Sequence, residues 1–146
     1  MRRFAFVVQR LFSHWKMVML DWLRGKKMAD HLALGRWGEK QAAKFLHRQG
    51  WRILERNFAS AQGEIDLIAD DHGTLVFVEV RTRSSNTHGD GEQSVDRRKE
   101  LHLEQAARQY LRDWPRAECP HRFDIIAIEA SPEGKLVKLD HYPTAF

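Results

Sequence analysis

An acidic residue interrupts the most apolar strand-like segment of this sequence. Glu79 lies within residues 75–81, and strand alternation would place it on one face with Leu75 and Phe77. Burial of a lone carboxylate is costly unless the group is paired, hydrogen-bonded or bound to a metal ion. We therefore expect Glu79 to have a cationic or metal partner.

Two more acids, Glu64 and Asp66, lie in the strand-like segment that precedes it. A hairpin turn centred between residues 71 and 72 would place Glu64 opposite Glu79 on neighbouring strands. Asp66 would then lie diagonally from Glu79, at about 7–8 Å between Cα atoms. A shift of one residue in this pairing would give different neighbours, so the prediction depends on where the turn lies.

Three carboxylates on one face would destabilise the sheet unless a cation neutralised them. Arg81, Lys99 or a hard divalent ion with oxygen ligands could supply that charge. Lys99 lies four residues before Leu103 in a helical pattern, so we expect it to project towards the sheet. Arg97 and Arg98 are better placed for solvent or phosphate groups, although such a basic run is also typical of a solvated face.

Glu39 is a further acid, in a helix expected from Leu34 to Gly50. Its spacing to Ala42 and Leu46 places it at the border of the apolar face that should pack on the sheet. It could join the carboxylate cluster from the helix. It could equally be a solvated charge in the first turn, where a negative group suits the helix dipole, and the residues alone favour this second interpretation.

The remaining pattern defines the elements that must position these residues. The first three strands should form an antiparallel meander, and the strand after the long helix could join in parallel. The sequence thus predicts an α/β domain with a mixed central sheet flanked by helices. The expected strands are residues 51–58, 64–69, 75–81, 123–128 and 135–141, with a polar loop over 82–93 and a helix from about Ser94 to Trp114 that Pro115 ends.

An amphipathic helix is predicted near the N-terminus, because apolar residues recur at helical spacing over residues 4–23. Charged residues interrupt this segment, so it lacks the apolar run that a membrane span needs. Its basic residues and tryptophans suit peripheral membrane contact through residues 3–24. Packing on its own domain or on a second copy of the chain is an equally good interpretation.

The composition indicates a small protein of the reducing cytoplasm. Its 146 residues suit an N-terminal extension, 1–30, and one domain, 31–146, and Met28 is an alternative start. Lys and Arg outnumber Asp and Glu by 24 to 20, a mild excess that suits a polyanionic partner. Cys119 is the single cysteine, so no intramolecular disulfide can form.

Several ordered motifs resemble the YraN-like family of small bacterial proteins. They are Gly35 to Glu39 before an alanine-rich helix, Gly63 to Ile68 (GEIDLI), and Val76 to Arg83 (VFVEVRTR). The resemblance covers about residues 31–128 and implies a restriction-endonuclease-like fold, similar in motif order to archaeal Holliday-junction resolvases. It implies that Glu39 is the helix-borne acid, Asp66 the central metal ligand and Glu79 the acid of a Glu-x-Lys element. Glu64 would be an auxiliary acid, and Mg²⁺ or Mn²⁺ the cofactor.

One position departs from this pattern, because Arg81 stands where the superfamily commonly has a lysine. Arginine stays protonated and cannot act as a base, although it can hold a phosphate or orient water. Lys99 could take the missing role if its helix brings the amine near Asp66 and Glu79. The departure leaves catalysis open even if the metal site is present.

Three functions remain open on the sequence. The first is a Mg²⁺- or Mn²⁺-dependent endonuclease that acts on DNA, including branched DNA. The second is a nucleic-acid-binding module with little or no hydrolysis, and the third is a membrane-peripheral adaptor that uses the N-terminal helix. A homodimer is expected only by analogy with the junction resolvases. The predicted nucleic-acid contacts are Arg81, Arg83, Arg97, Arg98 and Lys99.

Overall fold

The computed structural model describes the chain in three stretches, residues 27–85, 97–115 and 118–146. The chain divides into two compact units, Met1–Leu34 and Gly35–Phe146. The second unit contains the sheet and every predicted site residue, and the description below concerns this unit.

The predicted N-terminal amphipathic helix lies outside the described residues, so membrane contact through residues 3–24 stays a prediction. The predicted division of the chain into residues 1–30 and 31–146 also remains a prediction. No helix within the described stretches is long and apolar enough to cross a membrane.

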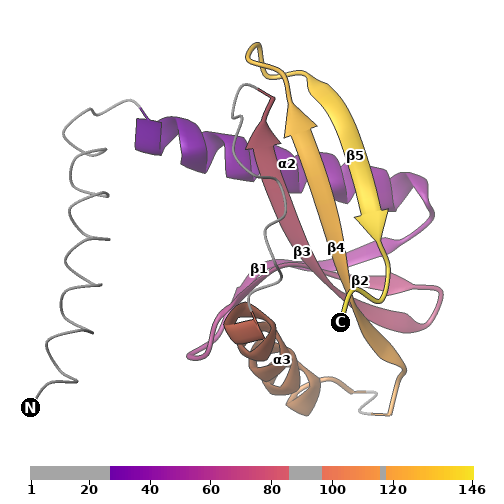
Figure 1. The fold of residues 1–146 in the computed structure, drawn as a ribbon. Coiled ribbons are helices and arrows are strands. Elements are labelled where there is room, and N and C mark those ends of the chain that lie inside the picture. Colours follow the sequence, from indigo (N-terminus) through magenta and orange to yellow (C-terminus); the bar gives the residue numbers. More distant parts are fainter. Residues whose placement is uncertain (1–26, 86–96, 116–117) are drawn as a thin grey trace, which may run out of the picture. The chain divides into compact units, whose positions relative to one another are not determined.

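Five strands form one mixed sheet in the order β1-β2-β3-β4-β5 (Figure 1). The first three strands are antiparallel neighbours, β4 joins β3 in parallel, and β5 returns antiparallel to β4. The expected meander and the parallel addition are thus confirmed. The strands are Arg52–Ala59 (β1), Glu64–Asp71 (β2), Thr74–Ser84 (β3), His121–Ala130 (β4) and Leu136–Tyr142 (β5).

Two helices accompany the sheet, α2 (Lys27–Arg48) and α3 (Arg97–Arg112). Helix α2 begins before the expected Leu34 and ends as predicted, because Gly50 adopts a φ of 85° that suits the residue after a helix. The predicted start of α3 at residue 94 lies outside the described residues. The arrangement has α/β character and is consistent with a restriction-endonuclease-like fold.

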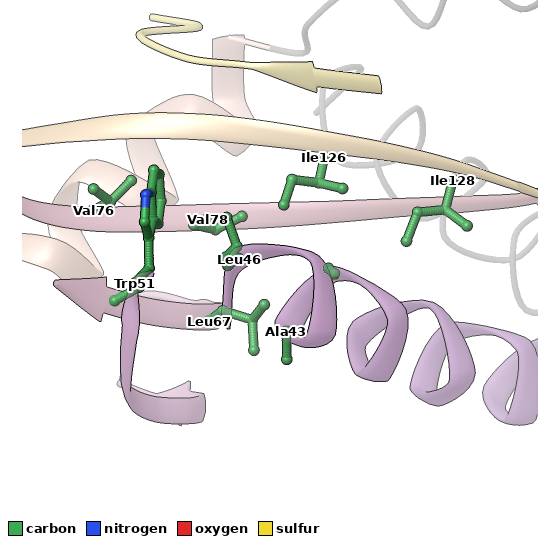
Figure 2. Packing of buried hydrophobic residues seen from close by; sticks show 10 residues of the cluster. Ala43, Leu46, Trp51, Leu67, Val76, Val78, Ile126 and Ile128 are labelled. Carbon is green, nitrogen blue, oxygen red and sulfur yellow. The ribbon is translucent and has the colours of Figure 1, made fainter. Parts of the chain in front are cut away.

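Each helix packs against one face of the sheet, as the alternation of β3 requires. Val76 and Val78 belong to the cluster under α2, whereas Leu75 and Phe77 belong to the cluster under α3. Figure 2 shows the first cluster, in which α2 packs on side chains from β2, β3 and β4. Its buried members are Ala42, Ala43, Leu46, Trp51, Leu67, Ala69, Val76, Val78, Ile126 and Ile128.

The turn between β2 and β3 lies one residue later than expected. Asp71 pairs with Thr74, so the turn residues are His72 and Gly73, whose φ values are 50° and 101°. Two consecutive positive φ values are what a two-residue type I′ hairpin needs, and glycine adopts them without strain. The Asp70 carboxylate also accepts a hydrogen bond from the Gly73 N–H at 2.8 Å.

This turn corrects the register on which the cross-strand prediction depended. The last pair of the β2–β3 ladder is Leu67 with Val78, so Asp66 and Glu79 are the next residues of the two strands, just beyond the ladder. The expected pairing of Glu64 with Glu79 is therefore wrong, because the ladder does not reach Glu64, which pairs with Ala59 of β1. The observed register brings Asp66, rather than Glu64, next to the strand position of Glu79.

Candidate functional site

Glu79 is a buried carboxylate with a cationic partner, as its place in an apolar strand predicted. It is 5% exposed on β3, and its Oε1 forms an ion pair with Nζ of Lys99. Lys99 lies in the first turn of α3, and its side chain is 55% exposed. The pair therefore connects the buried face of β3 to solvent through a lysine side chain.

Asp66 lies where β2 separates from β3. Its Oδ2 accepts a hydrogen bond from the backbone N–H of Val80 at 2.7 Å, just beyond the last pair of the β2–β3 ladder. Ile65 and Leu67 pack in different core clusters although they are two residues apart, so the alternation of β2 changes at Asp66. A side-chain carboxylate thus takes the place of a strand carbonyl as the partner of Val80.

Burial raises the pKa of Asp66 from its ordinary 3.8 to about 7. The hydrogen bond from Val80 acts in the opposite direction, and the negative charges of Glu79 and Glu39 raise the pKa further. The positive charge of Lys99 lowers it by a smaller amount. Asp66 is therefore about half protonated near neutral pH, and its ionised form is only partly compensated by its protein surroundings.

Glu39 reaches this cluster from α2. The residue is half-buried rather than fully solvated, and its charge acts on Asp66. The residue before it, Gly38, lies against the side chain of Thr82 on β3, so the helix backbone closely approaches the strand here. This contact brings the helix-borne acid to the end of β3 that follows Glu79.

The donor set suits a hard divalent cation held by two carboxylates. Magnesium is commonly bound by one or two carboxylates together with water and substrate phosphate. Asp66 and Glu79 are oxygen donors just beyond the end of the β2–β3 ladder, and a bound cation would stabilise the ionised form of Asp66 that burial disfavours. Within the described residues no three His, Cys, Asp or Glu side chains form a group arranged to hold a metal ion, so Glu39 does not complete such a group.

The basic residues predicted to contact nucleic acid differ in their surroundings. Arg81 is half-buried and forms no ion pair with another described residue. Arg83 forms an ion pair with Glu129 of β4 at 2.9 Å. Arg97 and Arg98 are exposed in the first turn of α3, beside the Lys99 that pairs with Glu79.

Glu64, the predicted auxiliary acid, is not part of the cluster. It is exposed at the start of β2, next to the turn that joins β1 to β2. The structure therefore brings Asp66, Glu79 and Lys99 together, with Glu39 acting through its charge.

A second polar cluster surrounds Asp124, a fully buried residue of β4 that the sequence analysis missed. Its carboxylate accepts hydrogen bonds from Nε of Arg122 at 3.0 Å and from the backbone N–H of Thr144 at 3.0 Å. Nε2 of His141 on β5 lies 2.8 Å from the same carboxylate. The signal was the one that identified Glu79, an acid within an apolar strand.

The Asp124 cluster holds the edge of the sheet together. Arg122 also pairs with Asp71 at 2.9 Å and lies over the Trp51 ring, 5.1 Å from its centroid. His141 contacts that ring edge-on. Because the acid and its donors satisfy one another, the cluster has the character of a structural network linking β2, β4 and β5.

Comparison with known proteins places this site inside a family match. The model of the uncharacterised protein family UPF0102 matches residues 38–128, which include all four of the residues in and around the carboxylate cluster. A UPF0102 protein of Pelotomaculum thermopropionicum is 42% identical over 120 residues, 82% of this chain and 100% of that protein.

Other relatives give the same result. A UPF0102 protein of Syntrophotalea carbinolica is 40% identical over 80% of this chain and 94% of its own length. One from Chlorobium phaeobacteroides is 44% identical over 77% of this chain and 93% of its own length. The resemblance to the YraN-like proteins is thereby confirmed, and the chain belongs to the UPF0102 family.

Proposed function

We propose that this protein binds nucleic acid and hydrolyses its phosphodiester bonds with the help of Mg²⁺ or Mn²⁺. The observation that carries the proposal is the pair of carboxylates, Asp66 and Glu79, just beyond the end of the β2–β3 ladder and beside Lys99. A buried acid, a neighbouring half-buried acid with a raised pKa and a lysine that reaches solvent are typical of functional sites rather than of packing.

Each residue of the cluster has a role in this proposal. Asp66 and Glu79 would hold the metal ion, which when bound polarises a phosphate oxygen and supplies hydroxide. Glu39 would orient water from α2, since its charge acts on Asp66. Lys99 and Arg81 stabilise negative charge on the phosphate, because their cations lie on or beside the strand that carries Glu79.

The substrate is nucleic acid, with DNA the expected form. Arg83, Arg97 and Arg98 would contact backbone phosphates and so give affinity without sequence readout. Their exposed side chains lie at the end of β3 and the start of α3, the same elements that carry Glu79 and Lys99. Branched DNA and a symmetric dimer are part of the proposal by the resemblance alone, and a cytoplasmic location is part of it because of the single cysteine.

A second function is favoured by one observation. Arg81 occupies the position of the lysine in the Glu-x-Lys element and cannot accept a proton. A protein with this change could keep the metal site and the phosphate contacts but lose hydrolysis. The alternative is therefore a nucleic-acid-binding module with little or no nuclease activity.

Incubation with labelled substrates in Mg²⁺ or Mn²⁺ tests the proposal. Duplex, flapped and four-way DNA and single-stranded RNA are compared for binding and for cleavage. We expect metal-dependent cleavage that Asp66→Asn and Glu79→Gln abolish and that Glu64→Gln, the exposed acid of the same strand, retains. Binding without cleavage supports the binding module, and cleavage that survives both substitutions in the cluster would refute the assigned site.

A further inference from the structure

We propose that Gly38 and Thr82 are positioning residues whose size-matched contact sets how closely Glu39 approaches Asp66. The role given to Glu39 in this inference rests on the proposed function. The contact between Gly38 and Thr82 does not, because it is present in the metal-free protein. Neither residue would touch the metal or the substrate. Both act through the helix that carries the acid.

The contact leaves no space for a side chain at Gly38. A Cβ atom there would lie 1.9 Å from Oγ1 of Thr82, 2.9 Å from its Cβ and 3.1 Å from its Cγ2. Contacts under about 3 Å between such atoms cannot persist, so the helix or the strand would have to move. Gly35, one turn earlier in the same helix, has nothing within 4 Å of the equivalent position.

Shape rather than hydrogen bonding defines this contact. Oγ1 of Thr82 is buried and has no hydrogen-bond partner among the described residues. A buried hydroxyl without a partner is unfavourable, so the hydroxyl is not what attracts the helix to the strand. The close approach instead allows Ala42 and Ala43, one turn later, to reach the core under α2.

The position of the contact explains why it would matter for the site. Gly38 immediately precedes Glu39, and Thr82 immediately follows Arg81 and lies three residues after Glu79. Because Ala42 is fully buried and holds the next turn of α2, extra bulk at residue 38 would tilt this end of the helix away from β3. Glu39 would then move away from Asp66, on which its charge now acts.

Thermal unfolding of the metal-free protein tests the size match. Gly38→Ala should lower the melting temperature, whereas Gly35→Ala, the same change on the same helix, should leave it unchanged or raise it. Thr82→Ala removes two of the three close atoms, so Gly38→Ala/Thr82→Ala should regain most of the loss. Thr82→Val keeps the bulk and should rescue nothing. Equal melting temperatures for Gly38→Ala and Gly35→Ala would overturn the size match.

A double-mutant cycle tests the positioning itself. Glu39→Gln and Asp66→Asn are combined, and their coupling in the unfolding free energy is measured at about pH 8, above the pKa of Asp66. We expect this coupling to fall by about half or more in a Gly38→Ala background and to return when Thr82→Ala is added. Coupling that is unchanged by Gly38→Ala would overturn the proposal.

Two features of this design keep its outcome separate from other failures. If Gly38→Ala does not fold, Thr82→Ile enlarges the strand side of the same contact by one heavy atom and should weaken the coupling in the same way. No metal or nucleic acid is present in either measurement. Absence of metal binding or cleavage in the wild-type protein would therefore contradict the proposed function and leave this test intact.

Discussion

Oδ2 of Asp66 accepts a hydrogen bond at 2.7 Å from the backbone N–H of Val80, at the point where β2 and β3 cease to pair. This bond holds the carboxylate in place before any ligand arrives, near the buried Glu79, whose charge acts on it. A preorganised acceptor of this kind loses little side-chain freedom when a cation binds. The divergence of two strands thus creates the proposed site.

The raised pKa of Asp66 predicts an unusual dependence of stability on pH. Because the folded-state pKa of about 7 exceeds the ordinary 3.8, folding favours the protonated acid. The contribution of this group to stability is complete below about pH 4 and is lost as pH rises through about 7. Asp66→Asn keeps an acceptor for Val80 and should remove this loss, as denaturant unfolding of the metal-free protein across that range would show.

The matched control for this experiment is Glu64→Gln, an exposed acid of the same strand. Its pH profile should coincide with that of the wild-type protein. A profile for Asp66→Asn that still falls between about pH 4 and 7 as in the wild type would contradict the origin assigned to the effect.

Lys99 competes with a metal ion for Glu79, because its ammonium already pairs with that carboxylate. Lys99→Met should therefore raise Mn²⁺ affinity by about threefold to tenfold, a modest gain because the lysine is half-exposed. The same change should weaken binding of labelled DNA, since a phosphate contact is lost. Unchanged or weaker Mn²⁺ binding by this variant, measured by calorimetry, would argue against a metal position next to Glu79.

Arg81→Lys separates the nuclease from the binding module. A lysine at this position can lose its proton, whereas arginine cannot, so cleavage should increase by about tenfold or more if Arg81 limits the rate. DNA affinity should change little because the charge is kept. Arg112→Lys, an exposed position in the last turn of α3, is the control and should leave cleavage unchanged. Cleavage by neither the wild type nor Arg81→Lys, with binding retained in both, would favour the binding module.

The fold was largely predictable because its strands and helices have clear periodicity. Glu79 was identified for a general reason, its place in an apolar strand, and its ion pair with Lys99 agrees with that reasoning. The β2–β3 register at Glu79 was not predictable, since it depended on whether Asp71 or Gly73 joins His72 in the turn.

Two other features depend on tertiary contacts that no local pattern contains. The alternation of side chains between the two faces of β2 changes at Asp66. This change is visible only in the structure, where Ile65 and Leu67 pack in different core clusters. The Asp124 cluster joins residues from three strands. Arg122 is near Asp124 in the sequence, whereas His141, Thr144 and Asp71 are distant from it.

The Asp124 cluster predicts a large effect on stability. Asp124→Ala would leave Arg122 and His141 without their shared partner in a buried site, at a cost of about 3–5 kcal/mol in unfolding free energy. Glu129→Ala is the control on the same strand, because its ion pair with the exposed Arg83 should contribute about 0–1 kcal/mol. Similar losses for the two variants in denaturant titrations would contradict the role given to the cluster.

The measurement that tests the central claim most directly is calorimetric titration of Mn²⁺ into the protein and its variants. We predict saturable binding by the wild type and by Glu64→Gln, and a loss of about tenfold or more in affinity for Asp66→Asn and for Glu79→Gln. Wild-type affinity in a protein carrying both Asp66→Asn and Glu79→Gln, or no binding by the wild type, would contradict the assignment of these two carboxylates as a metal site.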